Sequence, residues 1–236
     1  MLHLNRRGAV FAGTEEDIEA LRRQFDQEHC LHLRGLLEPE LRLLVQPQLD
    51  RAEFKAEHYD KIGSELHMAR NPVWSLLHFL TNDLQFFQQV RQITGCGRIG
   101  CFGGRVYRLL PDLTHSFAWH DDLDEAGRML GMSVNLSTEA YRGGLLEIRD
   151  SASQQILYRA DPLEWGDALL FRIAPHLKHR VTCVEGPRSK TAFAGWFQSR
   201  PDFYAILQEM RAELVDNGCP DRPRATETAV ARRECP

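Results

Sequence analysis

Apolar positions in the first hundred residues recur with the spacing of amphipathic helices. Thr14 can cap a first helix, whose apolar stripe follows directly behind it. Further stripes predict three more helices, which begin at Pro39, Asn71-Pro72 and Asn82. The segment Leu31 to Leu33 alternates with polar neighbours and predicts a short strand. Residues 1–97 are therefore expected to form a mainly helical part that packs on a core.

From residue 98 the pattern changes to short apolar or alternating runs between turn signals such as Gly143-Gly144 and Gly186-Pro187. Eight strands are predicted, at Val106–Leu110, Phe117–His120, Leu130–Leu136, Leu145–Arg149, Gln155–Tyr158, Ala168–Ile173, His179–Val184 and Thr191–Phe197. Short strands with such separators are typical of a sandwich or jelly roll. The expected fold class is mainly β with flanking helices (α+β).

The end of the chain is expected to lie outside this core, which spans residues 98–200. Apolar spacing predicts a last helix over residues 201–216, and the polar segment 217–236 is expected to be disordered.

Composition narrows the class of protein. The 236 residues fit one domain with extensions, and 43% hydrophobic with 26% charged residues is typical of a globular chain. A net charge of −4 without a basic block argues against nucleic-acid binding. No apolar run is long enough for a membrane span, and no signal peptide is evident. Six scattered Cys without a C-x-x-C predict reduced thiols and a cytoplasmic protein.

The candidate chemistry is concentrated in His120-Asp121-Asp122 and His179. Residues i and i+2 of a strand point to the same side, so His120 and Asp122 are expected to project into one space. A second imidazole from another strand could complete the set. Two His and one carboxylate leave the other metal positions open, an arrangement that suits non-haem Fe(II) oxygenases. A cation just beyond His179, Arg188 or Lys190, could hold an anionic co-substrate.

A second His-x-Asp, His58-Tyr59-Asp60, is interpreted as accidental. It is flanked by charged residues and lies in a stretch that indicates helix and loop, where i and i+2 do not share a face.

Several motifs then occur in the order found in a known family: His120-Asp121-Asp122, Ser133 to Ser137, Tyr141 to Gly144, Gly166 to Phe171, His179-Arg180-Val181 and Gly195-Trp196-Phe197. Through them, residues 98–198 resemble the 2-oxoglutarate/Fe(II)-dependent oxygenases, in their prolyl-4-hydroxylase-like branch. The resemblance implies a double-stranded β-helix, a jelly roll whose mouth holds the iron.

The resemblance also implies the site residues. His120, Asp122 and His179 become the iron ligands. His176 competes for the third place, but it follows Pro175 in an expected loop, so His179 is favoured. The residue six before the Trp of the Gly-Trp-Phe ending is Lys190, which is favoured over Arg188 as the anchor for the 2-oxoglutarate C5 carboxylate.

Secondary positions follow from the same comparison. Tyr107 is a candidate contact of 2-oxoglutarate, and Asn135 and Met132 are candidate pocket residues. Trp119 and Trp196 are expected to form core or pocket wall.

The implied reaction uses Fe(II), 2-oxoglutarate and O2, with ascorbate as a candidate additional reductant, and releases succinate and CO2. Asp122 favours hydroxylation, since related halogenases lack the acidic ligand. The substrate is expected to be a small molecule, amino acid or peptide, with a protein prolyl hydroxylase or a non-catalytic metal-binding sensor as alternatives. The oligomeric state is left open. Residues 55–70 are expected to be either a loosely tied lid over the mouth or an ordinary surface connection.

Overall fold

The computed structural model describes residues 1–111, 115–123 and 127–200. In these ranges four helices form, namely α1 (Glu15–Glu28), α2 (Pro39–Leu49), α3 (Pro72–Thr81) and α4 (Leu84–Thr94). The strands are β1 (Leu2–Asn5), β2 (Gly8–Phe11), β3 (Cys30–Leu33), β4 (Phe54–Tyr59), β5 (Gly63–Met68), β6 (Cys101–Leu109), β7 (Phe117–His120), β8 (Arg128–Asn135), β9 (Arg142–Gly143), β10 (Leu146–Asp150), β11 (Ile156–Arg159), β12 (Ala168–Arg172), β13 (Leu177–Val181), β14 (Val184–Glu185) and β15 (Lys190–Gln198). The helix and tail expected after residue 200 lie outside the described residues. None of the helices in the described ranges combines the length and apolar character needed to cross a membrane.

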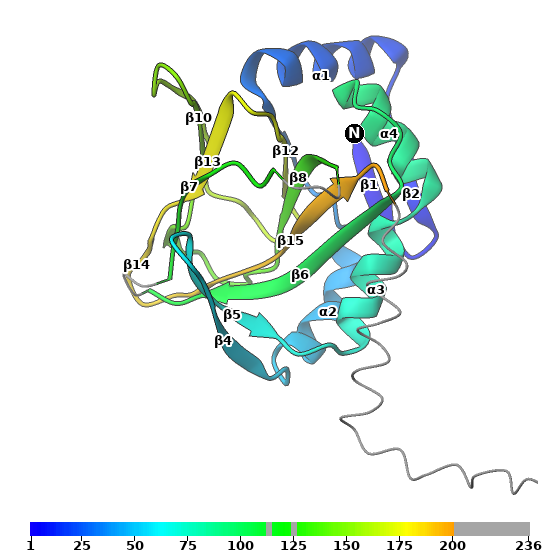
Figure 1. The fold of residues 1–236 in the computed structure, drawn as a ribbon. Coiled ribbons are helices and arrows are strands. Elements are labelled where there is room, and N and C mark those ends of the chain that lie inside the picture. Colours follow the sequence, from blue (N-terminus) through cyan, green and yellow to red (C-terminus); the bar gives the residue numbers. More distant parts are fainter. Residues whose placement is uncertain (112–114, 124–126, 201–236) are drawn as a thin grey trace, which may run out of the picture. The chain divides into compact units, whose positions relative to one another are not determined.

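One antiparallel sheet of eleven strands forms the body of the fold, in the order β11-β10-β13-β7-β5-β6-β15-β8-β12-β3, with β4 added on β5. The sheet curls back on itself, so that β10, β13 and β7 lie across from β15, β8 and β12 (Figure 1). Leu146 and Ile148 of one arm share a buried cluster with Leu169 and Phe171 of the other. The expected mainly β, jelly-roll class is confirmed.

The helices cover the outer face of the arm that contains β6, β15 and β8 (Figure 1). Alternation along β15 explains this face. Phe193 and Phe197 point outward and are fully buried against helical residues such as Phe86. Lys190, Ala194 and Trp196 have the other parity and line an interior cavity. One strand thus carries the core on one side and the functional cavity on the other.

Side-chain caps set the starts of α1, α3 and α4. Thr14 forms a capping box with Asp17, and Asn71 accepts a hydrogen bond from the Trp74 amide, both as expected. The fourth helix differs by one residue, because Asp83 caps it instead of Asn82. The Asn82 amide instead exchanges two hydrogen bonds with the backbone of Phe102 in β6, which ties the helical layer to the sheet.

The N-terminal part contains more strand than the helical expectation. Strands β1 and β2 form a hairpin, and β4 and β5 form another where helix and loop were expected. Strand β4 is largely exposed, so its sequence carries no apolar stripe that would reveal it. Strand β5 pairs with both β6 and β7, so residues 54–68 are part of the sheet and the expectation of a loosely tied segment was wrong.

Candidate metal centre and pocket

The two imidazoles of the site are brought together by strand register. His120 ends β7 and His179 lies in β13, and the two are direct antiparallel partners. Side chains of directly opposed residues point to the same face of a sheet. Their ring centroids are therefore only 4.3 Å apart.

Asp122 joins them through a left-handed backbone after the strand and not through strand alternation. Strand β7 stops at His120, and Asp122 has a left-handed backbone with φ of 57°. Its Oδ2 lies 3.1 Å from His179 Nε2, and its Oδ1 lies 3.5 Å from His120 Nε2. The expectation of a shared space was correct, but its strand-parity reason was not.

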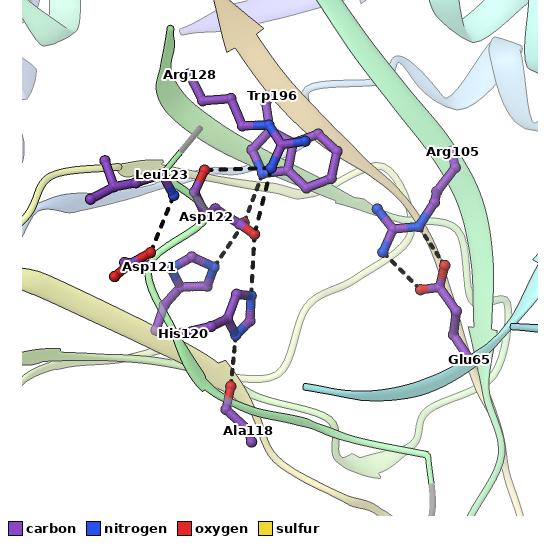
Figure 2. Close-up of polar contacts among 10 residues, drawn as sticks. Glu65, Arg105, Ala118, His120, Asp121, Asp122, Leu123, Arg128 and Trp196 are labelled. Atoms are coloured by element: carbon purple, nitrogen blue, oxygen red, sulfur yellow. Dashed lines mark hydrogen bonds and ion pairs between the residues drawn. The ribbon is translucent and has the colours of Figure 1, made fainter. Parts of the chain in front are cut away.

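Neighbouring groups orient these ligands. The Nδ1 of His120 lies 2.6 Å from the Ala118 carbonyl oxygen, which can only accept, so Nδ1 carries the proton and the Nε2 lone pair is free. The Trp196 indole donates to Asp122 Oδ2 at 2.7 Å (Figure 2). Each of these two ligands is thus held by a hydrogen bond from outside the cluster.

The protonation states suit metal binding. Burial by itself raises the pKa of Asp122, but His179, His120 and the Trp196 indole together hold that pKa below its ordinary value. Burial, reinforced by His179, lowers the pKa of His120. A carboxylate and a neutral imidazole are the forms that bind metal.

The spacing also fits one ion. The three ligand atoms lie within 4.8 Å of one another. In an octahedral site with bonds of about 2.1 Å, adjacent ligands are about 3 Å apart, close to the 3.1 and 3.5 Å that separate the Asp122 oxygens from the two imidazoles. Within the described parts of the chain, this is the single group of three potential metal ligands.

A cavity of about 420 Å³ opens in front of the three ligands, between the two arms of the sheet. Its walls are largely apolar, with contributions from Leu146, Leu169 and Phe171. Such a cleft with a few convergent polar groups is the ordinary form of a small-molecule site.

The two candidate anchors lie in different places. Lys190 begins β15, is buried, lines the cavity and donates to the Gly144 carbonyl at 2.6 Å. Burial lowers the pKa of Lys190 to about 8. Arg188 is exposed before the strand begins and forms an ion pair with Glu139 at 2.9 Å.

The secondary candidates Tyr107, Met132 and Asn135 also lie in different places. Tyr107 and Met132 line the cavity, and burial raises the pKa of Tyr107 to about 12, so its hydroxyl keeps its proton. Asn135 does not line the cavity. Its buried amide donates to the carbonyls of Leu163 and Glu164, so its expected place beside the co-substrate was wrong.

The histidines that were not favoured as ligands lie outside the cluster. His176 stacks edge-on against His29 with ring centroids 5.8 Å apart. His58 is exposed on β4.

Trp119 carries the guanidinium groups of Arg149 and Arg180 on its ring and does not line the cavity.

Sequence reasoning missed the polar wall beside the ligands. Arg128 lies over the Trp196 ring at 3.7 Å, and Arg105 pairs with the fully buried Glu65 (Figure 2). One sequence feature could have pointed to Arg105 as a cavity residue, namely that it has the same strand parity as the candidate Tyr107. The partner Glu65 lies 40 residues away on a strand that was not predicted.

Residues 105–198 match the family model described as the 2OG-Fe(II) oxygenase superfamily. No curated protein matches the sequence. Solved structures with a similar fold include a Pseudomonas putida prolyl-4-hydroxylase, with 16% identity over 78% of this chain and 99% of that chain and a TM-score of 0.58.

Two further structures show the same fold. A Trichoplax adhaerens prolyl hydroxylase, solved with a hypoxia inducible factor peptide fragment, is 13% identical over 84% of this chain and 93% of that chain, with a TM-score of 0.59. The non-heme alpha ketoglutarate dependent epimerase SnoN from nogalamycin biosynthesis is 15% identical over 94% and 95%, with a TM-score of 0.56. At these identities the likeness establishes the fold.

Proposed function

On the premise that residues 105–198 belong to the 2OG-Fe(II) oxygenase superfamily, we propose that this enzyme hydroxylates an unactivated C–H bond of a small molecule, amino acid or peptide. The observation that carries the proposal is the His120, Asp122 and His179 cluster at the floor of an apolar cavity. Three protein ligands on one side leave room for co-substrate and O2 on the other.

Each site residue receives a role in this proposal. His120, Asp122 and His179 hold Fe(II), and Trp196 keeps the Asp122 carboxylate turned toward it. The bound iron and 2-oxoglutarate supply the oxidative chemistry, with succinate and CO2 as co-products. The protein supplies orientation and a cavity whose apolar walls exclude water.

Lys190 is assigned to the C5 carboxylate of 2-oxoglutarate. It is a buried cation of the cavity wall on β15, and within the described ranges its ammonium has one hydrogen-bond acceptor, the Gly144 carbonyl. A buried cation with few partners gains most from an anionic ligand. Tyr107, on the neighbouring strand β6, lines the same cavity, and we propose that its hydroxyl adds a hydrogen bond to this carboxylate.

The reaction class follows from Asp122. Its carboxylate would take the iron position that a halide needs in related halogenases, so hydroxylation is proposed over halogenation. The buried Lys190 favours an enzyme over a metal-binding sensor, because a bare metal site has no use for a carboxylate anchor.

Succinate formation tests the proposal. Protein loaded with Fe(II) and supplied with 2-oxoglutarate and O2 is expected to release succinate slowly without substrate, and faster when a substrate pool contains its target. Products are expected to gain the mass of one oxygen atom. A chelator of Fe(II) should abolish succinate formation. Leaving out ascorbate should shorten the time over which succinate is formed. Failure to bind both Fe(II) and 2-oxoglutarate would refute the proposal.

A further inference from the structure

Arg105 has a fixed position on the cavity wall. It projects from β6 with the same parity as Tyr107 and lines the cavity. Two of its guanidinium nitrogens bind the carboxylate of Glu65: Nε contacts Oε1, and Nη2 donates to Oε2 at 3.0 Å. Figure 2 shows this pair across the site from Asp122.

The pair is supported from several sides. Glu65 is fully buried in β5, and the Tyr59 hydroxyl donates to its Oε1 at 2.9 Å. The guanidinium carbon of Arg105 lies 5.5 to 5.6 Å from the ring centres of Tyr59, Tyr107 and Trp196. A side chain held by a bidentate ion pair among three rings has little freedom left. The burial and support indicate a built site and not a solvated surface charge.

One edge of the guanidinium is left for a ligand. Among the described residues, no acceptor bonds the Nη1 of Arg105. Figure 2 shows this nitrogen on the side that faces Asp122 and Trp196. The open donors therefore point into the cavity in front of the metal ligands.

Charge decides which acceptor suits this edge. Glu65 already balances the charge of Arg105 within the wall. A substrate carboxylate on the open edge would face the Glu65 carboxylate across a single guanidinium, away from bulk water, where like charges repel strongly. A neutral carbonyl oxygen still accepts a charge-assisted hydrogen bond and adds no second negative charge.

We propose that Arg105, oriented by Glu65, binds a neutral carbonyl group of the substrate, which is accordingly an amide, ester or ketone and not a free carboxylic acid at that position. This inference rests on the proposed oxygenase function and narrows its substrate class. Glu65 and Tyr59 are positioning residues, because they act through Arg105.

Matched fragment pairs test the inference. Protein loaded with Fe(II) and saturated with 2-oxoglutarate, kept without O2, is titrated with cyclopentanecarboxamide and cyclopentanecarboxylate and then with benzamide and benzoate. Ligand-observed NMR reads binding, since broadening by Fe(II) marks fragments beside the metal. The amide of each pair is expected to bind at least about fivefold more tightly than the acid.

Two variants separate the role of Glu65 from that of Arg105. Glu65→Gln leaves the charge of Arg105 unbalanced, so the preference is expected to shift toward the acid by about fivefold or more. The double variant Arg105→Gln with Glu65→Gln removes both charges together and avoids a buried unpaired carboxylate. It is expected to weaken amide binding about tenfold, the scale of one charged hydrogen bond. Arg108→Gln, on the same strand with the opposite parity, is the matched control and should bind as wild type does.

The inference is overturned if wild type binds both members of each pair equally, prefers the acid or binds neither. It is also overturned if the folded double variant, checked by its melting temperature, retains wild-type amide binding. A wild type that takes up neither Fe(II) nor 2-oxoglutarate would refute the proposed function instead. Because uptake of Fe(II) and 2-oxoglutarate is measured before the fragments are added, the two failures are distinguished.

Discussion

His120 and His179 are direct partners across the antiparallel strands β7 and β13, and their rings lie 4.3 Å apart. The ligand set therefore depends on the register of two strands as well as on residue identity. Because side chains alternate along a strand, a slip of one residue would turn one imidazole to the opposite face of the sheet. The same pairing explains why His176, three residues before His179 and outside the strand, does not take part.

The metal site gives the first prediction. Asp122→Ala removes the single carboxylate of the cluster and is expected to abolish stoichiometric Fe(II) binding and succinate release together. Metal content after gel filtration measures the first effect. His58→Ala and His176→Ala should retain one iron per chain, since both rings lie away from the cluster. Loss of iron in either control would show that the ligand set is wrong.

The second prediction concerns the indole that holds Asp122. Trp196→Phe keeps a ring in the wall but removes the hydrogen bond to Asp122 Oδ2. Loss of such a supporting contact typically weakens metal affinity about ten- to a hundredfold. Competition with a chelator of known affinity measures the change. Trp119→Phe is the control, because the Trp119 ring packs against Arg149 and Arg180 and does not line the cavity. Equal effects of the two substitutions would contradict the assigned role.

Alternation was the most informative signal in the sequence. Lys190 and Trp196 have the same parity along the chain, and the structure puts both on the cavity wall. Parity alone could not decide between Lys190 and Arg188. The decisive fact is that β15 begins at Lys190, after an exposed turn, and the position of a strand end depends on its partner strands.

Other features depended on contacts between distant segments. The left-handed backbone of Asp122 is uncommon for a residue other than Gly, and alternation does not predict it. The pair of Arg105 and Glu65 joins strands that are 40 residues apart. Strand β4 has no buried face, so neither a period of two nor a helical stripe marked it.

The third prediction uses the titration of Lys190. Burial lowers its pKa to about 8, so in the free protein the ammonium is charged below pH 8 and becomes neutral above it. An anionic co-substrate needs the charged form. The KM for 2-oxoglutarate is therefore expected to be flat below pH 8 and to rise above it, by up to about tenfold per pH unit.

Substitution isolates this effect. Lys190→Ala should raise the KM for 2-oxoglutarate by about ten- to a hundredfold at pH 7, the scale of a charged hydrogen bond, and should remove the rise above pH 8. Arg188→Ala should keep the wild-type value and profile, because Arg188 is outside the cavity. The reverse ranking would transfer the anchor to Arg188.

The fourth prediction tests whether Asn135 stabilises the fold or binds 2-oxoglutarate. Its buried amide donates to the carbonyls of Leu163 and Glu164 and accepts from the Ser137 amide. Asn135→Ala is expected to lower the free energy of unfolding by about 1–3 kcal/mol, because buried carbonyls lose their donor. Urea denaturation measures this loss. The KM for 2-oxoglutarate should stay unchanged in the folded variant, and a rise would return Asn135 to the binding site.

The fifth prediction concerns the hairpin of β4 and β5, whose Tyr59 and Ile62 line the cavity. Strand β5 is held between β4 and the main sheet through pairs such as Leu66 with Arg108. Backbone amide hydrogens of a paired interior strand exchange slowly with solvent, because exchange requires the sheet to open.

Hydrogen exchange of residues 63–68 is therefore expected to be slow already in the protein without iron, co-substrate or substrate. The turn at Asp60 and Lys61, between the paired strands, should exchange fast in the same sample and serves as the internal reference. A loosely tied lid would give the opposite result, with fast exchange across the segment until ligands bind. Slow exchange before any ligand is added would establish the hairpin as a fixed wall that holds Glu65 against Arg105.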